Sequence, residues 1–226
     1  MNQFEKETVS LLSESGLPSF VVRGLLASLS EERASRANGT APNRVISNSL
    51  RLLFGCLLSL LMTPVILSLW AIVVFSDGRP GFFVQKRVGM GSEVFRLFKI
   101  RTIRSCFPEV ATHQLAPHSI FPLGRILRST KLDELPQVLN MALGQLSLVG
   151  HRPSLTSQSH LIRLRQDAKV DLARPGITGL AQILGVDMSE PRTLVRIEST
   201  YLAKKSLTLD FWILVATFLV PFARNK

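Results

Sequence analysis

The chain has 226 residues, of which 27 are lysine or arginine and 16 are aspartate or glutamate, giving a formal net charge of +11. This length fits one substantial core with additions, and the charge predicts a polyanionic partner: nucleic acid, an anionic bilayer surface or a phosphorylated substrate. A hydrophobic content of 46%, with only one tyrosine and two tryptophans for base stacking, argues against nucleic acid.

The first 43 residues form a separate zone. The start, Met-Asn-Gln-Phe-Glu-Lys-Glu, lacks the cationic and apolar regions of a secretory signal, which predicts that the chain stays on the cytoplasmic side. Apolar residues recur on both sides of 16–18, which predicts two short amphipathic helices. Residues 32–44 are polar and typical of a linker. This extension is either a surface anchor, a partner-binding arm or a packing appendage.

Residues 52–75 form an apolar run of 24 residues without a charge. A straight helix of that length would reach roughly 36 Å, enough to span a bilayer. Pro64, preceded by Thr63, lies near the middle and predicts a bend. Basic residues flank both ends, so both ends prefer the cytoplasm. We expect a re-entrant membrane helix hairpin over residues 44–77, with a straight span as the alternative.

The remaining residues, 78–226, predict a small cytoplasmic domain. Residues 81–88 and 94–100 have the pattern of two strands that form a hairpin around Gly89-Met90-Gly91. Residues 105–122 are irregular. Helices are expected at about 133–143, 156–172 and 193–203, and an apolar tail at 211–223 is too short to span a membrane and lies against the bilayer or the core. The expected fold class is α+β, mainly helical, with a short β-hairpin and amphipathic surface helices.

Cysteine and histidine residues form no recognisable site. Cys56 falls in the apolar run and Cys106 in a polar stretch, so no disulfide framework is predicted. The four histidines have no partners at the spacing of a zinc site, and His113 and His118 are expected to be ordinary surface residues.

Asp133 and Glu134 are adjacent carboxylates in the stretch Leu-Asp-Glu-Leu-Pro-Gln, between arginine-rich segments. If Asp133 caps a helix, Pro136 falls in the first turn, where its missing N–H costs no hydrogen bond. The helix dipole keeps such a carboxylate ionised, so it can act as a nucleophile or hold Mg²⁺. Helix capping alone is the alternative.

Basic side chains form a second group of candidates. They are Lys99, Arg101, Arg104, Arg125, Arg128, Lys131, Arg152 and Arg174. Arginine matches phosphate oxygens in bidentate fashion. Arg152 and Arg174 lie beside prolines in rigid turns, which favours ligand binding there. A basic rim that faces anionic lipid is the alternative, and we favour it for Arg125, Arg163 and Arg165.

Five sequence blocks occur in a fixed order. They are Gly-Arg-Pro-Gly-Phe-Phe-Val-Gln-Lys-Arg-Val-Gly (78–89), Phe-Arg-Leu-Phe-Lys-Ile-Arg-Thr (95–102), Leu-Arg-Ser-Thr-Lys-Leu-Asp-Glu-Leu-Pro-Gln (127–137), Ser-Leu-Val-Gly-His-Arg-Pro (147–153) and Arg-Pro-Gly-Ile-Thr-Gly-Leu-Ala-Gln (174–182). Together they resemble the bacterial sugar transferase family, the monotopic polyprenyl-phosphate phosphoglycosyl transferases, over about residues 45–220. The resemblance is specific because all five blocks occur in this order, whereas no single block would identify the family.

The resemblance implies a reaction and its catalytic residues. Asp133 matches the nucleophile that attacks the β-phosphate of a UDP-sugar, forms a phosphosugar-enzyme and releases UMP. Glu134 matches the partner carboxylate that helps to hold Mg²⁺. Undecaprenyl phosphate would then accept the sugar phosphate, which starts the assembly of a lipid-linked polysaccharide on the cytoplasmic face of the inner membrane.

The resemblance also implies binding roles. Lys99, Arg128 and Arg152 match basic positions near the diphosphate, while Arg174 and Gln182 match a block that shapes the nucleotide or acceptor site. Arg101 belongs to the same predicted phosphate-binding group. Thr63-Pro64 matches the helix-breaking pair of a re-entrant membrane helix.

Three features depart from the family pattern, and one of them is the segment Val186-Asp187-Met188-Ser189, which replaces a commoner Gly-Arg-Asn type segment. His151 stands where the family usually has proline, and Leu180 replaces a frequent tryptophan. The expected partners are a UDP-sugar, undecaprenyl phosphate and inner-membrane phospholipid, without nucleic acid, and association into a homo-oligomer is left open. The rival hypothesis from another class is a non-catalytic membrane scaffold that binds anionic lipid.

Overall fold

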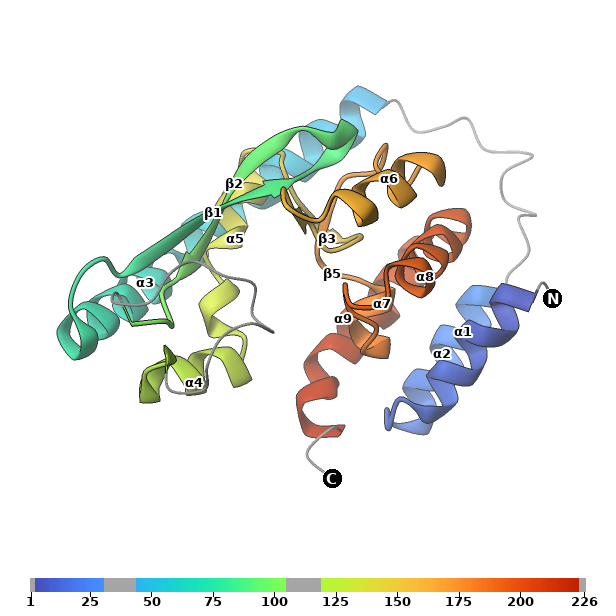
Figure 1. The fold of residues 1–226 in the computed structure, drawn as a ribbon, viewed down its shortest axis with the longest axis horizontal. Coiled ribbons are helices and arrows are strands. Elements are labelled where there is room, and N and C mark those ends of the chain that lie inside the picture. The colour runs from blue at the N-terminus through green and yellow to red at the C-terminus, as the bar shows by residue number, and fades with distance from the viewer. Residues whose placement is uncertain (1–2, 31–43, 105–118, 224–226) are drawn as a thin grey trace. The chain divides into compact units, whose positions relative to one another are not determined.

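The structure is a computed structural model that describes residues 3–30, 44–104 and 119–223. Most of the predicted linker and of the predicted irregular segment at 105–122 lies outside these residues. The chain forms two compact units. Figure 1 colours the elements by residue number from the N-terminus to the C-terminus. Unit 1 consists of Met1–Asn48, Arg87–Phe95 and Gln145–Lys226, and unit 2 of Ser49–Lys86 and Arg96–Gly144. The predicted domains, 1–43, 44–77 and 78–226, follow other boundaries and stay predictions.

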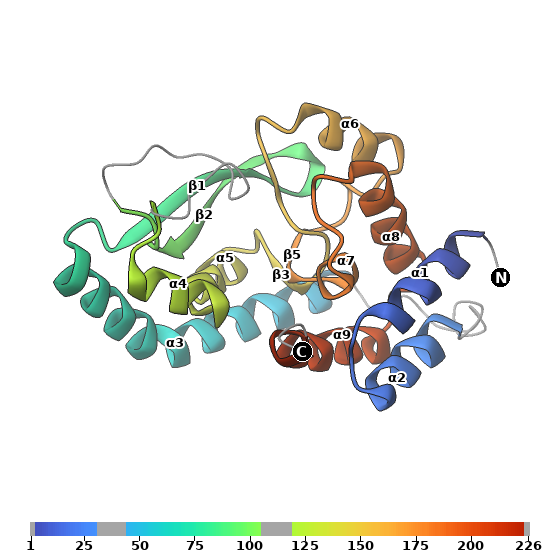
Figure 2. The same ribbon diagram turned by 60° about the horizontal axis from the view of Figure 1, so that its bottom comes forward.

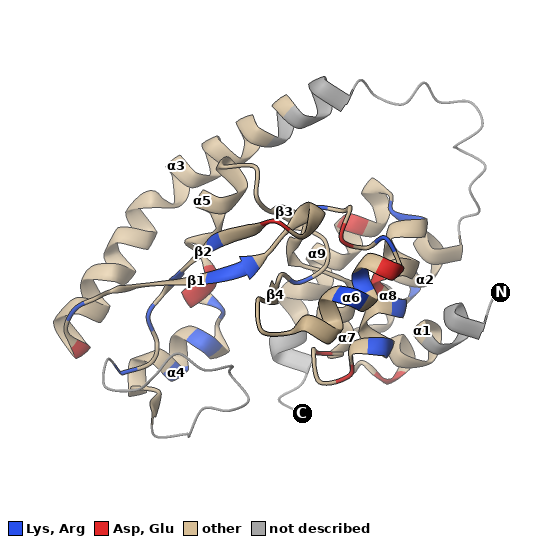
Figure 3. Cartoon of the chain, turned by 45° about the horizontal axis from the view of Figure 1, so that its top comes forward, with Lys and Arg blue, Asp and Glu red and all other residues tan. Residues whose placement is uncertain are grey.

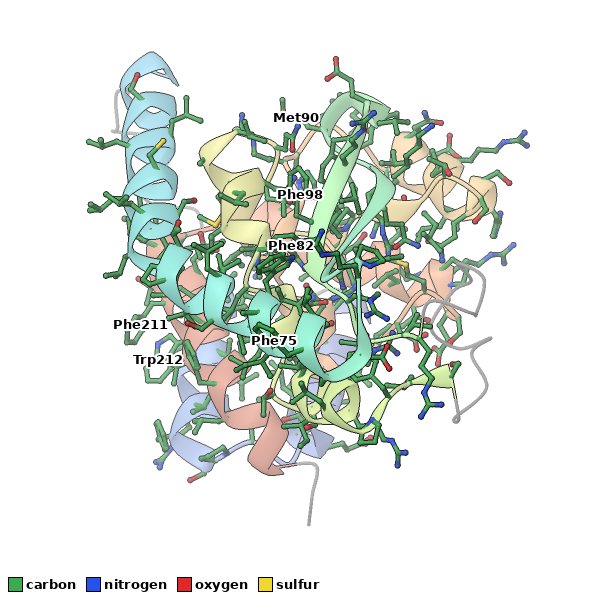
Figure 4. All side chains as sticks on the ribbon, turned by 90° about the vertical axis from the view of Figure 1, so that its left-hand side faces the viewer. Phe75, Phe82, Met90, Phe98, Phe211 and Trp212 are labelled. Atoms are coloured by element: carbon green, nitrogen blue, oxygen red, sulfur yellow. The ribbon has the colours of Figure 1, made fainter. Side chains whose placement is uncertain are left out.

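Unit 2 is built around α3 (Arg44–Asp77), a helix of 34 residues that starts in unit 1 and carries Pro64 in its interior. Thr63 donates its hydroxyl to the carbonyl of Ser59 at 2.7 Å, beside the hydrogen bond that proline removes. Figure 4 shows the axis of α3 changing direction along its length, and Pro64 accounts for such a bend.

One stretch of α3, Leu52–Asp77, is the only helix among the described residues that is long and apolar enough to cross a membrane, by length and composition. Figure 3 shows the middle of α3 without charged residues. Much of its apolar surface is exposed, including Leu57, Leu60 and Phe75. A stripe at helical spacing, with Ile66 and Val73, instead packs into the unit.

The other elements of unit 2 pack on this stripe. They are β1 (Phe82–Val88), which continues into unit 1, β2 (Val94–Ile100), α4 (Pro122–Ser129), the 3₁₀ turn η5 (Leu132–Glu134) and α5 (Gln137–Ala142). The buried core contains Ile66, Val73, Ile100, Phe121, Leu127 and Val138. Gly55 lets α3 approach α5 closely, because a Cβ there would lie 2.8 Å from the backbone of Met141 and Ala142. A hydrogen bond of 2.8 Å from the Ser59 hydroxyl to the Val138 carbonyl joins the same two helices.

Unit 1 is mainly helical. Its elements are α1 (Gln3–Glu14), α2 (Ser19–Ser30), the turn η2 (Met90–Ser92), β3 (Ser147–Val149), β4 (Ser154–Leu155), α6 (Ser159–Asp167), β5 (Gly176–Thr178), α7 (Leu180–Leu184), α8 (Pro191–Lys204) and α9 (Leu207–Ala223). The predicted pair of N-terminal helices is confirmed. Leu25 of α2 packs in one core with Leu209 and Ile213 of α9, so the extension belongs to the body of unit 1.

Two small sheets complete the described part of the fold. The first has the strand order β2-β1-β4, and β1 pairs antiparallel with β4 through Arg87 with Leu155 and Val88 with Ser154. The second is a parallel pair, β3 with β5, which Figure 2 shows side by side. The predicted β-hairpin and the α+β, mainly helical fold class are confirmed. The re-entrant path through a membrane stays a prediction.

Candidate active site

The segment between α4 and α5 sets the position of the two adjacent carboxylates. Lys131 takes left-handed backbone angles (φ 57°, ψ 17°), which turns the chain sharply after α4. Asp133 and Glu134 then lie in η5, and α5 begins at Gln137 with Pro136 as its first flanking residue. The prediction that Asp133 caps the following helix is therefore wrong: a separate 3₁₀ turn carries it, and its side chain is buried.

Glu134 forms an ion pair with Lys99 of β2. The Lys99 Nζ lies 2.7 Å from Glu134 Oε1, and both side chains are only 14% exposed. At this burial the pair is screened by water much less than a surface salt bridge. The structure thus brings together a strand lysine and a turn carboxylate that are 35 residues apart in the chain.

Arg128 supplies a second cation to this cluster. Its Nε donates to the Thr102 hydroxyl at 2.8 Å, which fixes the side chain of α4 against the end of β2. Burial lowers the pKa of the Arg128 guanidinium, while the charges of Asp133 and Glu134 act to raise it. An arginine guanidinium inside a protein keeps its proton at physiological pH. Unit 2 therefore holds two carboxylates and two cations in one place. We call Lys99, Arg128, Asp133 and Glu134 the charged cluster.

Arg101 has a different environment from the charged cluster. Its guanidinium is buried and donates to the Asp77 carboxylate at 2.7 Å and to the carbonyl of Ile103 at 3.0 Å, and it also binds the carbonyls of Asp77, Gly78 and Pro80. These bonds fasten the carboxyl end of α3 to the end of β2. A role for Arg101 in phosphate binding stays a prediction, and its contacts favour a structural one.

Unit 1 brings the two proline-containing turns side by side. The Gly176 amide donates to the carbonyl of His151 and the Gly150 amide to that of Thr178, each at 2.8 Å. No side chain fits at this contact, because a Cβ on Gly176 would lie 2.2 Å from the Gly150 nitrogen. Arg152 and Arg174 therefore leave neighbouring backbone segments, and their predicted roles in ligand binding stay predictions.

Gln182 lies in α7, next to these turns. Its Nε2 donates to the Ile177 carbonyl at 3.1 Å. Its Oε1 is buried and has no hydrogen-bond partner among the described residues. Since a buried acceptor without a partner is costly, Gln182 is a candidate to accept a hydrogen bond from a ligand.

His151 is buried, with 5% of its surface exposed. Burial lowers the pKa of the imidazole to about 3, and the charges of Arg165 and Lys205 contribute in the same direction. His151 is therefore neutral at physiological pH and adds no charge to the turn. It lines a small pocket with Arg165, Ser154 and Gly89.

The prediction for Arg165 is wrong. It does not belong to a basic rim, because it is 3% exposed and forms a bidentate ion pair with Glu198, at 2.9 and 2.6 Å. Sequence reasoning also missed Asn140, which is fully buried and bonded to the backbone of β2. A polar residue on the apolar face of a short helix is the signal that could have found it.

The side chains that could hold a metal ion are few. Among the residues whose placement is described, no group of three or more His, Cys, Asp and Glu side chains is arranged to bind one. Mg²⁺ needs only one or two carboxylates, because substrate phosphates and water complete its shell. Asp133 and Glu134 are two adjacent carboxylates, so the predicted Mg²⁺ site stays a prediction that this count of side chains allows.

These features define a class: an α+β protein with a membrane-length apolar helix and, in the same unit, a carboxylate pair held among cations. The chain belongs to the bacterial sugar transferase family, whose model matches residues 42–224.

Three relatives illustrate the similarity. The chain is 38% identical over 136 residues to the UDP-glucose:undecaprenyl-phosphate glucose-1-phosphate transferase of Caulobacter vibrioides, covering 58% of this chain and 51% of the relative. It is 31% identical over 201 residues to the undecaprenyl-phosphate galactose phosphotransferase of Salmonella typhimurium, covering 81% and 42%. It is 33% identical over 177 residues to the exopolysaccharide production protein ExoY of Rhizobium meliloti, covering 70% and 77%. The chain thus spans about half or less of the length of the first two.

Proposed function

We propose that this protein transfers a sugar-1-phosphate from a UDP-sugar to undecaprenyl phosphate and so initiates the assembly of a lipid-linked polysaccharide. Support comes from membership of the family and from relatives that are named for this kind of transfer. The observation that carries the proposal is the charged cluster, in which buried Asp133 lies beside the Lys99–Glu134 pair and Arg128.

In the first step, a carboxylate oxygen of Asp133 attacks the β-phosphorus of the UDP-sugar. The bond from that phosphorus to the oxygen that bridges the two phosphates breaks, and UMP leaves with the bridging oxygen. An acyl phosphate that carries the sugar remains on Asp133. Lys99 and Arg128 stabilise the negative charge that builds up on the phosphate oxygens.

In the second step, a phosphate oxygen of undecaprenyl phosphate attacks the same phosphorus. The bond to Asp133 breaks, the carboxylate is regenerated, and the lipid diphosphate sugar leaves. The Asp133 carboxylate is thus the nucleophile of the first step and the leaving group of the second.

We further propose Mg²⁺ as the cofactor, held by Glu134 and Asp133. When bound, it would neutralise charge on the donor diphosphate. Lys99 orients the Glu134 carboxylate through their ion pair. Arg152, Arg174 and Gln182 are proposed to bind the nucleotide or the acceptor phosphate, and Arg101 to hold the end of α3.

The proposed location is the cytoplasmic face of the inner membrane, with α3 entering and leaving the bilayer on the same side. Support comes from the interior Pro64 and from the basic residues that flank both ends of the apolar run. Accessibility tags at residues 45 and 80 should both react from the cytoplasm. Labelling from opposite sides would refute the re-entrant path.

The activity is tested with purified protein, undecaprenyl phosphate and a panel of UDP-hexoses and UDP-N-acetylhexosamines. We expect release of UMP, and a sugar-phosphate adduct on Asp133 when donor alone is supplied, detected by intact mass. Asp133→Asn should abolish both while binding to membranes and the Tm are kept. UDP as the nucleotide product would indicate a simple glycosyl transfer, and no product from any donor would favour the scaffold hypothesis.

A further inference from the structure

Asn140 lies in α5 and is completely buried. Its side-chain amide makes two hydrogen bonds to one strand: Nδ2 donates to the carbonyl of Arg96 at 2.7 Å, and Oδ1 accepts from the amide of Phe98 at 3.1 Å. Phe98 is labelled in Figure 4. A helix side chain is thus bonded to two backbone groups of β2 that are two residues apart.

These bonds fill a gap in the sheet. Among the described residues, β2 lies at the edge of the sheet, whose strand order is β2-β1-β4. A carbonyl and an amide two residues apart point to the same side of a strand, and at an edge they have no neighbouring strand. A primary amide has both the donor and the acceptor that such a neighbour would offer. Asn140 therefore takes the place of a pairing strand at one step of the ladder.

The position of this contact links the two halves of the charged cluster. Lys99 follows Phe98 directly on β2, while Glu134 lies in the turn that leads into α5. The 2.7 Å distance between Lys99 and Glu134 depends on how β2 and α5 are held against each other. Asn140 is a direct polar connection between these two elements.

We propose that Asn140 is a positioning residue for phosphate transfer: its amide fixes β2 against α5 and thereby sets the place of Lys99 relative to Glu134. This inference rests on the proposed function. It requires a neutral amide, because a carboxylate of the same shape has no donor for the Arg96 carbonyl and an aliphatic side chain satisfies neither backbone group.

The test compares Asn140→Asp and Asn140→Ala with Ser59→Ala. The control removes a buried hydrogen bond to the Val138 carbonyl of the same helix, but it does not touch β2. The first readout is hydrogen exchange of the Val94–Ile100 peptide, and the second is kcat for UMP release, with KM for the donor measured in parallel. A misplacement on the order of 1 Å is enough to lower kcat by about tenfold to a hundredfold.

We expect both Asn140 variants to lose exchange protection in β2 and to lose at least about tenfold in kcat. Ser59→Ala should lower the Tm by a similar amount but keep β2 protected and kcat close to the wild-type value. The inference is overturned if the Asn140 variants and Ser59→Ala lose kcat equally at equal loss of Tm. It also fails if β2 stays protected without the amide. Wild-type protein that releases no UMP from any donor would refute the proposed function instead.

Discussion

Arg165 and Glu198 show how burial changes the meaning of a charge. Both side chains are at most 4% exposed, and the guanidinium binds both carboxylate oxygens. Burial raises the pKa of Glu198, and the charge of Arg165 opposes that shift. A buried pair of this kind adds little net stability, because desolvation of the two charges offsets their attraction. Each partner nevertheless neutralises the charge of the other inside the core.

We therefore expect Glu198→Leu to destabilise unit 1 by about 3–5 kcal/mol, because Arg165 would keep its charge without a counterion. Denaturant unfolding in detergent, followed by circular dichroism, measures this loss. Glu190→Leu, at an exposed site just before α8, is the matched control and should change stability by less than about 0.5 kcal/mol. An equal effect at the two sites would contradict the prediction.

His151 makes stability depend on pH. Its pKa in the folded protein is about 3, below the ordinary value of 6.5. As pH falls below 6.5 the unfolded chain binds a proton that the folded protein excludes. The stability that His151 contributes is therefore complete above pH 6.5 and is lost toward pH 3, by up to about 1.4 kcal/mol per pH unit.

Replacing His151 by Asn should flatten the fall in unfolding free energy between pH 6.5 and pH 4. The measurement is a series of denaturant titrations at fixed ionic strength. His160→Asn, at an exposed position on α6, is the control and should leave the slope unchanged. An unchanged slope in His151→Asn would show that carboxylates alone cause the acid sensitivity.

At the scale of elements, the contact between α3 and α5 depends on a missing side chain. A Cβ on Gly55 would come within 2.8 Å of the backbone of α5. This clash can be relieved only if the backbone of one of the two helices shifts. Gly55→Ala should cost about 1–3 kcal/mol, despite the better helix propensity of alanine. Thermal unfolding in detergent measures the loss. Leu60→Ala, on the exposed side of α3, should have a much smaller effect, and a stabilised Gly55→Ala would refute the close packing.

Long elements could be predicted from the sequence because their periodicity extends over several turns. The α1–α2 pair, the apolar helix and the β1–β2 hairpin were all predicted in this way. The helix expected at 156–172 is shorter, Ser159–Asp167. The strands β3 and β5 have three residues each, which is too few for a recognisable pattern of alternation. They pair because glycines allow two segments that are distant in the chain to approach closely.

The charged cluster could be predicted only in part. Asp133, Glu134, Lys99 and Arg128 were all named from the sequence, and their catalytic and binding roles stay predictions. Their arrangement in space depends on the left-handed backbone of Lys131 and on contacts with β2, which no sequence pattern indicated. The sequence alone does not reveal that an arginine is buried, so Arg101 was predicted to bind phosphate and Arg165 to lie on a basic rim, whereas both side chains are buried. Their partners, Asp77 and Glu198, lie 24 and 33 residues away.

At the scale of the whole molecule, the N-terminal helices are structural members of unit 1. Gly24 of α2 is covered by the indole ring of Trp212 from α9, and Leu25 is fully buried beside them. Figure 4 labels Trp212 on α9. This contact supports the packing-appendage interpretation of residues 3–30.

Leu25→Ala should therefore lower the stability of unit 1 by about 2–5 kcal/mol, the usual cost of a cavity of this size. Arg23→Ala, at an exposed position of α2, keeps the helix and should change stability by less than about 0.5 kcal/mol. Both are measured by denaturant unfolding. If Leu25→Ala has no effect on unfolding of unit 1, the extension is a separate arm.

The packing of α2 against α9 has a consequence for biosynthesis. A ribosome completes α2 at Ser30 but reaches Leu207, where α9 begins, about 180 residues later, which takes roughly 10–35 s in translation. During that interval the apolar helix α3 also emerges, while the apolar face of the nascent α1–α2 pair lacks the α9 residues that bury it in the folded protein. We expect a chaperone that binds the nascent chain at the ribosomal exit tunnel to shield this face until translation ends.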